Sequence, residues 1–157
     1  MNKQALALEK IALCKEQRLP YLDLSDLELT EIPQEVSTLE WLGALSLSRN
    51  KIKDISILKT LKNLHKLGLS NNQIADLSPL SSHKKMKFLF IQNNCICDLS
   101  PLSHLYRLKK IVANNNDIED IKILSSLPQL VYVDMAENPR CDLHPLKALN
   151  TLLILKT

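Results

Sequence analysis

The sequence predicts an α/β solenoid, in which stacked coils each add one strand to a single parallel sheet. One supporting observation is an asparagine that recurs with a constant 22-residue period, at Asn50, Asn72, Asn94, Asn116 and Asn138. A second is that columns of leucine, isoleucine and methionine keep the same period. A third is the alternation within each unit, as in Leu45-Ser46-Leu47, which is the period of a strand with one buried face. A fixed period of this length indicates repeat units that share one elongated core.

Residues 1–18 precede the repeats and are predicted to form a capping helix. Within them, residues 3–17 have the apolar spacing of an amphipathic helix. The side expected to contact the core carries Ala5, Leu8, Ile11, Ala12 and Leu13. Because the end of a solenoid leaves its core open, a helix at this point is expected to cover the first coil.

Residues 19–157 are predicted to form the repeat domain, with one atypical 23-residue unit, five 22-residue units and a partial last strand. In the first unit Leu27 stands where later units have asparagine, and the terminal units of a solenoid are commonly irregular. Leu152 and Leu155 begin a further strand near the C-terminus. No polar cap follows this strand in the sequence, so its edge is expected to be unpaired.

Each unit carries polar residues that fit a bend after the strand. An asparagine side chain can bond neighbouring backbone groups, so the five periodic asparagines are expected to form a ladder of buried amides. Asp54 and its equivalents at 22-residue intervals are expected to brace the same bend. The Ser-Pro pairs at 78–79 and 100–101 are expected to be the N-cap and first residue of short helical turns, and Ser56 to cap the equivalent turn.

The units resemble those of the leucine-rich repeat family. The resemblance rests on the pattern L-x-x-L-x-L-x-x-N-x-I-x-D, followed by Leu77-Ser78-Pro79-Leu80 in one unit and Leu99-Ser100-Pro101-Leu102 in the next. This is the short 22-residue form found in internalin-like bacterial proteins. The resemblance implies a horseshoe with a parallel β-sheet on its concave face and short helical turns on its convex side.

The N-terminal pattern over 22–33 is also similar to the start of bacterial multidomain leucine-rich repeat proteins, including Roco-type GTPases. The chain itself contains no GTPase motif. Internalins carry a secretion signal, whereas the charged residues of 1–18 leave no apolar run of that kind. The expected location is therefore the cytoplasm, and a bacterial adaptor, an effector that enters a host cell without a cleaved signal and a eukaryotic adaptor stay open.

The outward-facing strand positions give a candidate binding surface on the concave face. In the middle and later units they place four large side chains together, and we call these the aromatic patch: Phe88, Phe90, Val112 and Tyr132. Three charged residues are expected at its rim: Lys66, Lys110 and Asp134. Gly68 is expected to leave a shallow step beside Phe90. Exposed aromatic residues inside a charged rim are typical of a protein-interaction hot spot, so we expect a protein partner here.

Basic residues gather where the central coils lead into their strands. We call this set the basic edge: Lys62, His65, Lys66, Lys84, Lys85, Lys87, Arg107, Lys109 and Lys110. Acidic residues gather on the opposite edge toward the C-terminal end: Asp117, Glu119, Asp120 and Glu137. The basic edge lacks the interleaved aromatic residues of single-strand binders, and the net charge is only +3, so no nucleic acid partner is expected.

Other classes of function find little support. No Ser/His/Asp or Cys/His grouping converges in the repeat register, so no catalytic residues, metal site or cofactor are expected. The cysteines at 14, 95, 97 and 141 do not form a disulfide framework. Cys97 and Cys141 share a column two coils apart, about 10 Å, which is beyond disulfide reach. His83 takes a column held elsewhere by leucine and is interpreted as a tolerated replacement.

The segment 150–157 offers an alternative function. It is apolar and favours β-structure, so the unpaired strand edge could join two copies of the chain into a homodimer or a larger self-assembly. No stretch of the sequence is apolar over the length that spans a bilayer, so no membrane partner is expected.

Overall fold

The computed structural model describes residues 2–142, 144–148 and 154–156. Within these residues the chain forms one helix, α1 (Lys3–Glu16), and seven short strands. The strands are β1 (Tyr21–Asp23), β2 (Ala44–Ser46), β3 (Lys66–Gly68), β4 (Phe88–Phe90), β5 (Lys110–Val112), β6 (Tyr132–Asp134) and β7 (Ile154–Lys156). A short 3₁₀ turn follows each of the first six: Gln34–Thr38, Ser56–Thr60, Ser78–Leu80, Ser100–Leu102, Lys122–Ser126 and His144–Ala148.

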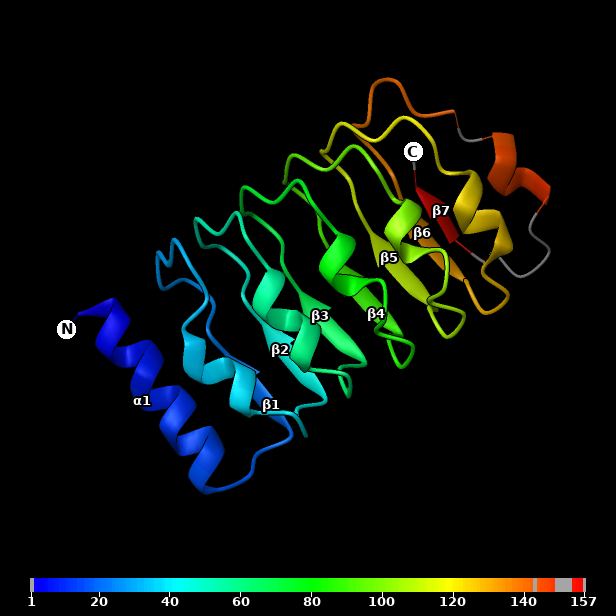
Figure 1. Cartoon of the computed structure of the whole chain (residues 1–157). Coiled ribbons are helices and arrows are strands. Elements are labelled where there is room, and N and C mark those ends of the chain that lie inside the picture. Colours follow the sequence, from blue (N-terminus) through cyan, green and yellow to red (C-terminus); the bar gives the residue numbers. More distant parts are fainter. Residues whose placement is uncertain (1, 143, 149–153, 157) are drawn as a thin grey trace.

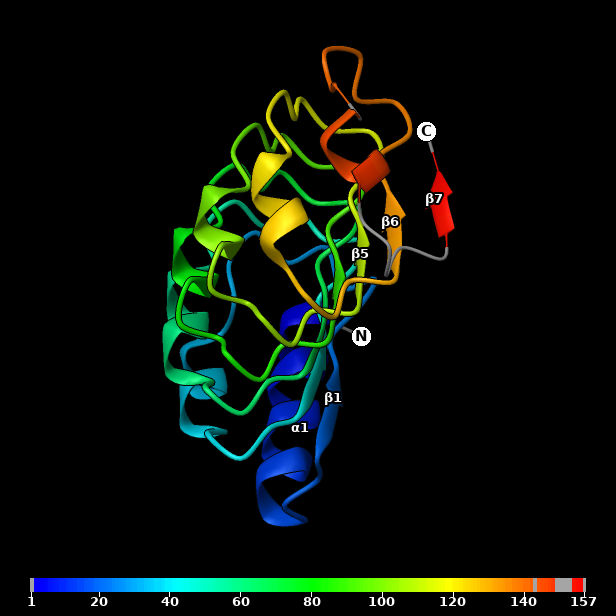
Figure 2. The same ribbon diagram turned by 90° about the vertical axis from the view of Figure 1, so that its right-hand side faces the viewer.

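The strands form one open parallel sheet in chain order, from β1 to β7. Tyr21 pairs with Ala44, which is 23 positions later in the chain. In every later pair, such as Lys66 with Phe88, the partner is 22 positions later. Figures 1 and 2 show the strands along one side of the solenoid and the 3₁₀ turns along the other. The predicted horseshoe, with a parallel sheet on one face and helical turns on the opposite face, is therefore confirmed.

The leucine columns fill the space between the sheet and the 3₁₀ turns. In each of the first six strands the central residue is buried and its two neighbours are more exposed, as with Leu89 between Phe88 and Phe90. A single coil cannot enclose its own apolar side chains, so each coil relies on the coils on either side to exclude water. A single apolar cluster consequently runs from Ala7 in α1 to Leu146.

The periodic asparagines tie each coil to the one before it. The Asn116 side chain is 5% exposed, and its Oδ1 accepts the Ile96 N–H at 3.0 Å. Its Nδ2 donates to the carbonyls of Ile91 and Ala113, each at 3.0 Å. Asn72, Asn94 and Asn138 repeat this pattern. Backbone groups at the bend that would otherwise be buried without partners are thereby paired.

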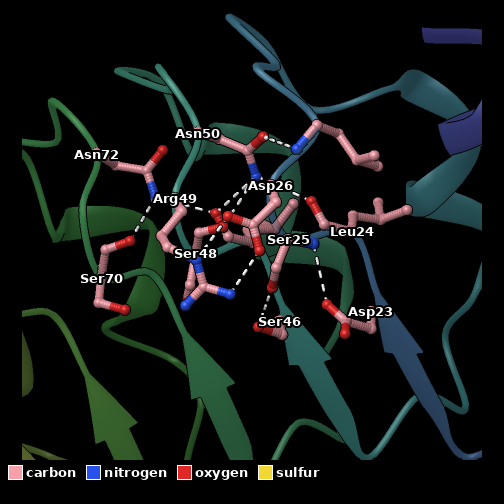
Figure 3. A network of polar contacts seen from close by, with 12 residues as sticks. Asp23, Leu24, Ser25, Asp26, Ser46, Ser48, Arg49, Asn50, Ser70 and Asn72 are labelled. Atoms are coloured by element: carbon pink, nitrogen blue, oxygen red, sulfur yellow. Dashed lines mark hydrogen bonds and ion pairs between the residues drawn. The ribbon is translucent and has the colours of Figure 1, made fainter. Parts of the chain in front are cut away.

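The start of the ladder explains the irregular first coil. Asn50 Oδ1 accepts the N–H groups of both Leu27 and Leu29, and its Nδ2 donates to the Leu24 carbonyl (Figure 3). Each asparagine thus bonds backward to the preceding coil. The first coil has α1 before it instead of a coil, so an asparagine at position 27 would find no such backbone. A buried leucine, 6% exposed, stands there instead.

An aspartate holds the bend before every 3₁₀ turn except the first, Gln34–Thr38, as the expectation that Asp54 and its equivalents brace the bend required; the expectation that serine caps the turn is wrong. Ser78 and Ser100 are the first residues of their turns, with Pro79 and Pro101 following, and neither serine side chain bonds a later N–H. Instead the aspartate two positions earlier accepts the backbone N–H, as Asp76 Oδ1 does from Ser78 at 2.7 Å. The same bond recurs at Asp54, Asp98, Asp120 and Asp142.

Ser78 and Ser100 each donate two hydrogen bonds to the aspartate two positions earlier. The Ser78 N–H lowers the pKa of Asp76, and the Ser100 hydroxyl lowers the pKa of Asp98. Ser56 is likewise the first residue of its turn, with both its N–H and its hydroxyl donating to Asp54. The serine therefore supplies donors to the aspartate, and the aspartate side chain is the group that accepts from the backbone.

Helix α1 packs against the first coil, but of the five residues expected on its buried face only Ile11 is buried. The buried residues are Ala7, Ile11 and Cys14, whereas Leu8 and Leu13 are 39% and 47% exposed. Ala5 and Ala12, also assigned to the buried face, are exposed. The spacing of Ala7, Ile11 and Cys14 gives a narrow stripe along the helix. Small side chains at both ends of that stripe allow a close approach to β1, where Cys14 Sγ lies 3.9 Å from the Tyr21 carbonyl oxygen.

The C-terminal strand β7 continues the register, since Tyr132 pairs with Ile154 and Asp134 with Lys156. Residues 149–153 and 157, which carry most of the segment expected to join two copies, lie outside the described residues. Among the described residues no helix is long and apolar enough to cross a membrane.

Candidate functional site

The outward-facing residues of β4, β5 and β6 lie side by side on the concave face. The strand register places Phe88 beside Lys110 and Lys110 beside Tyr132. At the far end of the same strands, Phe90 lies beside Val112 and Val112 beside Asp134. All six side chains are half-buried, in contrast to the fully buried residues between them. The four residues of the aromatic patch are therefore contiguous across three neighbouring strands.

Lys110 lies inside this surface, and its assignment to the rim is wrong. Its ammonium nitrogen is 4.1 Å from the centroid of the Tyr132 ring and 5.5 Å from that of Phe90. A cation over an aromatic face is attracted by the negative charge of the ring. The lysine separates the two rings and gives the patch a positively charged centre. Lys66 on β3 and Asp134 on β6 lie on either side of it.

Gly68 on β3 leaves a hollow beside Phe90, as expected. The hollow has a volume of about 220 Å³ and is lined by Tyr21, Ala44, Leu45, Ser46, Ser48, Lys66, Gly68, Ser70, Phe90 and Gln92. A Cβ atom at position 68 would lie 3.1 Å from Ser48 Oγ and 3.3 Å from Ser46 Oγ. A larger residue would therefore displace the serines and fill the space. The hollow is a recess of mixed polar and apolar lining next to the aromatic patch.

One residue that lines this recess carries a polar atom without a hydrogen bond. Gln92 Oε1 is buried and has no partner among the described residues. A buried acceptor without a donor is unfavourable by about 1–3 kcal/mol. Together the recess and the patch offer apolar area and a positive charge within one surface.

The charged residues at the two ends of the strands differ in whether they form ion pairs. Where the chain leaves the strands, ion pairs link successive coils, as in Asp26 with Arg49 (Figure 3) and Glu119 with Arg140. The basic edge lies where the chain leads into β3, β4 and β5. Among the ion pairs of the described residues, none involves a residue of the basic edge.

A column of strained backbone follows the strands and was not anticipated from the sequence. Its members all have positive φ: Asp26, Arg49, Asn71, Asn93, Asn115 and Glu137. Asparagine adopts this conformation more readily than other non-glycine residues, and three of the six positions have it. Asn93 Nδ2 donates to Asn71 Oδ1 at 2.9 Å, and Asn115 Nδ2 donates to Asn93 Oδ1 at 2.8 Å. The three asparagines form a second, exposed amide ladder.

The remaining titratable groups do not form a reactive site in the described part of the chain. His83 is fully buried, its Nε2 lies 3.0 Å from the Leu58 carbonyl oxygen, and burial lowers its pKa. All four cysteines are free thiols, and burial raises the pKa of Cys14 and of Cys141. No group of three or more metal-ligating side chains comes together among the described residues.

The fold and its concave surface define a leucine-rich repeat protein. A model of the leucine-rich repeats, in two copies, matches residues 44–82 and 62–104. The chain is a leucine-rich repeat protein of the bacterial, internalin-like type. Leucine-rich repeat domains are in general protein–protein interaction modules.

Solved structures of bacterial proteins support this family. Internalin C2 of Listeria monocytogenes is 36% identical, with a TM-score of 0.78 over 82% of this chain and 56% of that one. A second Listeria monocytogenes internalin, InlF, is 30% identical, with a TM-score of 0.79 over 83% of this chain and 38% of that one. A leucine-rich repeat protein of Leptospira interrogans is 26% identical, with a TM-score of 0.80 over 92% of this chain and 38% of that one.

The chain spans between 38% and 56% of the length of these three relatives. The comparison with curated protein sequences gave no match.

Proposed function

We propose that this protein is a non-catalytic binding module whose concave face contacts a protein partner. The proposed central contacts are the aromatic patch, namely Phe88, Phe90, Val112 and Tyr132. The proposed orienting charges are Lys66, Lys110 and Asp134. The observation that carries the proposal is the grouping of half-buried aromatic side chains on three adjacent strands, on the face away from the helical turns.

Packing energetics support a binding role for these side chains. The core positions of β4 to β6 are filled by Leu89, Ile111 and Val133, each fully buried. The aromatic rings lie on the other side of the sheet and add little to this core. Covering an aromatic side chain by a partner removes a large apolar area from water, which is why such residues dominate interface energies.

The test is a double variant, Phe88→Ala with Phe90→Ala, used together with the wild type as bait for partner capture. Partners retained by the wild type are expected to be lost by the double variant. Leu13→Ala is the control, since Leu13 is an apolar residue of α1 that is 47% exposed and lies outside both the aromatic patch and the recess. It is expected to retain the partner.

Thermal unfolding of the same proteins separates binding from folding. Because Phe88 and Phe90 are outside the core, the double variant is expected to melt within a few degrees of the wild type. A large fall in melting temperature together with full retention of the partner would assign these residues to stability and refute the proposed site.

A further inference from the structure

The basic edge is unlike the rest of the molecule in the pairing of its charges. Elsewhere residues stacked on successive coils form ion pairs: Arg49 with Asp26, Lys51 with Glu28, and Arg140 with Glu119. On the basic edge the stacked neighbours are alike in charge. The Lys109 N–H bonds the Lys87 carbonyl, so these two lysines occupy equivalent places on adjacent coils.

The segments that carry these charges contain no acidic residue. The segments that lead into β3, β4 and β5 are 60–65, 82–87 and 104–109, and none of them contains aspartate or glutamate. Where side chains of the basic edge do find polar partners, these are neutral: Lys62 bonds Ser82, and Lys85 bonds Asn63. Like charges on neighbouring strands are destabilising, so this arrangement weakens the fold slightly at this edge.

The basic edge is continuous with the proposed binding surface. Lys66 and Lys110 belong to both, and Lys110 already lies over Phe90 and Tyr132. His65, Lys87 and Lys109 directly precede the strand residues Lys66, Phe88 and Lys110. A partner that covers the aromatic patch would therefore meet a row of unpaired cations on one side.

We propose that the partner is an acidic protein segment that covers the aromatic patch and extends over the basic edge with its carboxylates. This inference rests on the proposed function and specifies the chemistry of the partner. Complementary charge raises association rates and fixes the orientation of docking, and its effect weakens with salt. Apolar side chains of the segment contact the patch, and carboxylates pair with Lys87, Lys109 and their neighbours.

The test uses two short synthetic peptides that share interspersed phenylalanines and differ only in having glutamate or glutamine at the polar positions. Binding of each labelled peptide is measured by fluorescence anisotropy at low and high salt. The glutamate peptide is expected to bind at least tenfold more tightly at low salt, and this advantage is expected to disappear at high salt. Equal affinity of the two peptides at low salt would overturn the inference.

A charge-reversed variant locates the effect. Lys87→Glu with Lys109→Glu is expected to weaken binding of the glutamate peptide at least tenfold and to leave the affinity for the glutamine peptide unchanged. The control with the same change in net charge is Lys53→Glu with Lys59→Glu, because both lysines are exposed and lie away from the strands. A control that weakens binding as much as the test variant would show that net charge acts without a defined surface.

The same assay distinguishes the inference from the proposed function. If Phe88→Ala with Phe90→Ala abolishes binding of both peptides while the charge-reversed variant changes neither affinity, the aromatic patch is supported as the binding site and the inference of an acidic partner is refuted. If the charge-reversed variant weakens binding and the phenylalanine variant does not, the proposed site fails.

Two other occupants are tested alongside. An oligonucleotide of the same charge is expected to bind more weakly than the glutamate peptide, and tighter binding would assign the basic edge to nucleic acid. Sedimentation at low salt is expected to show a monomer. Self-association that is reversed by Lys87→Glu with Lys109→Glu would assign the basic edge to a second copy of the chain.

Discussion

The ammonium nitrogen of Lys110 lies 4.1 Å from the centroid of the Tyr132 ring, on the neighbouring strand of the concave face. This contact holds the lysine stem against the aromatic patch and its charge above it. The lysine is therefore positioned before any partner arrives, which lowers the entropy lost on binding.

The Lys110–Tyr132 contact predicts a measurable coupling. In a double-mutant cycle of Lys110→Gln and Tyr132→Leu, urea unfolding should give an interaction free energy of about 0.5–1 kcal/mol. The substitutions keep most of the chain length and apolar volume, so the term isolates the cation–ring attraction. The comparison cycle pairs Lys66→Gln with Tyr132→Leu and should give a coupling near zero. Equal couplings in the two cycles would contradict a specific contact.

The asparagine ladder predicts a large loss of stability from a small change. Asn116→Ala removes one acceptor and two donors from buried backbone, so the free energy of unfolding should fall by about 2–4 kcal/mol. Asn114→Ala, at an outward-facing position of the same coil, should change it by less than about 0.5 kcal/mol. Chemical denaturation of the two variants measures both values. Similar losses would mean that the buried amides do not organise the bend.

The column of positive φ predicts a stabilising substitution. Glu137 has a φ of 56°, in line with Asn115 at 54° on the preceding coil. Asparagine tolerates this conformation better, so Glu137→Asn should raise the free energy of unfolding by about 0.5–1 kcal/mol. Glu31→Asn is the control, since Glu31 is exposed and is not among the residues with positive φ. A gain of the same size at both positions would point to charge instead of backbone conformation.

His83 predicts a pH dependence that one substitution should remove. Burial lowers the folded-state pKa of His83 below its ordinary value of 6.5, so the unfolded chain takes up the proton first as pH falls. Stability is therefore complete above about pH 6.5 and declines below it, by at most about 1.4 kcal/mol per pH unit.

His83→Leu should flatten this decline, because Leu61, Leu105 and Leu127 fill the same buried column in other coils. It should also stabilise the protein by about 1–3 kcal/mol at neutral pH, since His83 Nδ1 is buried without a partner. The Leu58 carbonyl keeps a bond from the Leu61 N–H and is not left unpaired. Thermal melts of wild type and variant across this pH range test both statements. An unchanged slope would assign the pH dependence to other groups.

The fold could be predicted because its information is periodic. A slip of one residue in any strand would turn Leu67 or Leu89 outward, and the asparagine column fixes the coil length independently. Two local details were predicted wrongly. The buried face of α1 depends on how closely Ala7 and Cys14 let the helix approach β1, which one helix alone does not reveal. The periodic aspartates were expected to brace the bend, but the Ser-Pro pattern favoured Ser78 over Asp76 as the side chain that accepts from the backbone.

The candidate site could be predicted only in part. The strand register alone placed Phe88, Phe90, Val112 and Tyr132 together. The position of Lys110 over the rings depends on its side-chain conformation, which periodicity does not specify. The left-handed column was also missed, although the three asparagines at 71, 93 and 115 are a signal that could have indicated it.

The dissociation constant of the captured partner tests the central claim most directly. Measured by calorimetry, it should rise at least tenfold in Phe88→Ala with Phe90→Ala and stay unchanged in Leu13→Ala, while both variants remain folded. An unchanged dissociation constant in a folded Phe88→Ala/Phe90→Ala variant would contradict recognition through the concave aromatic patch.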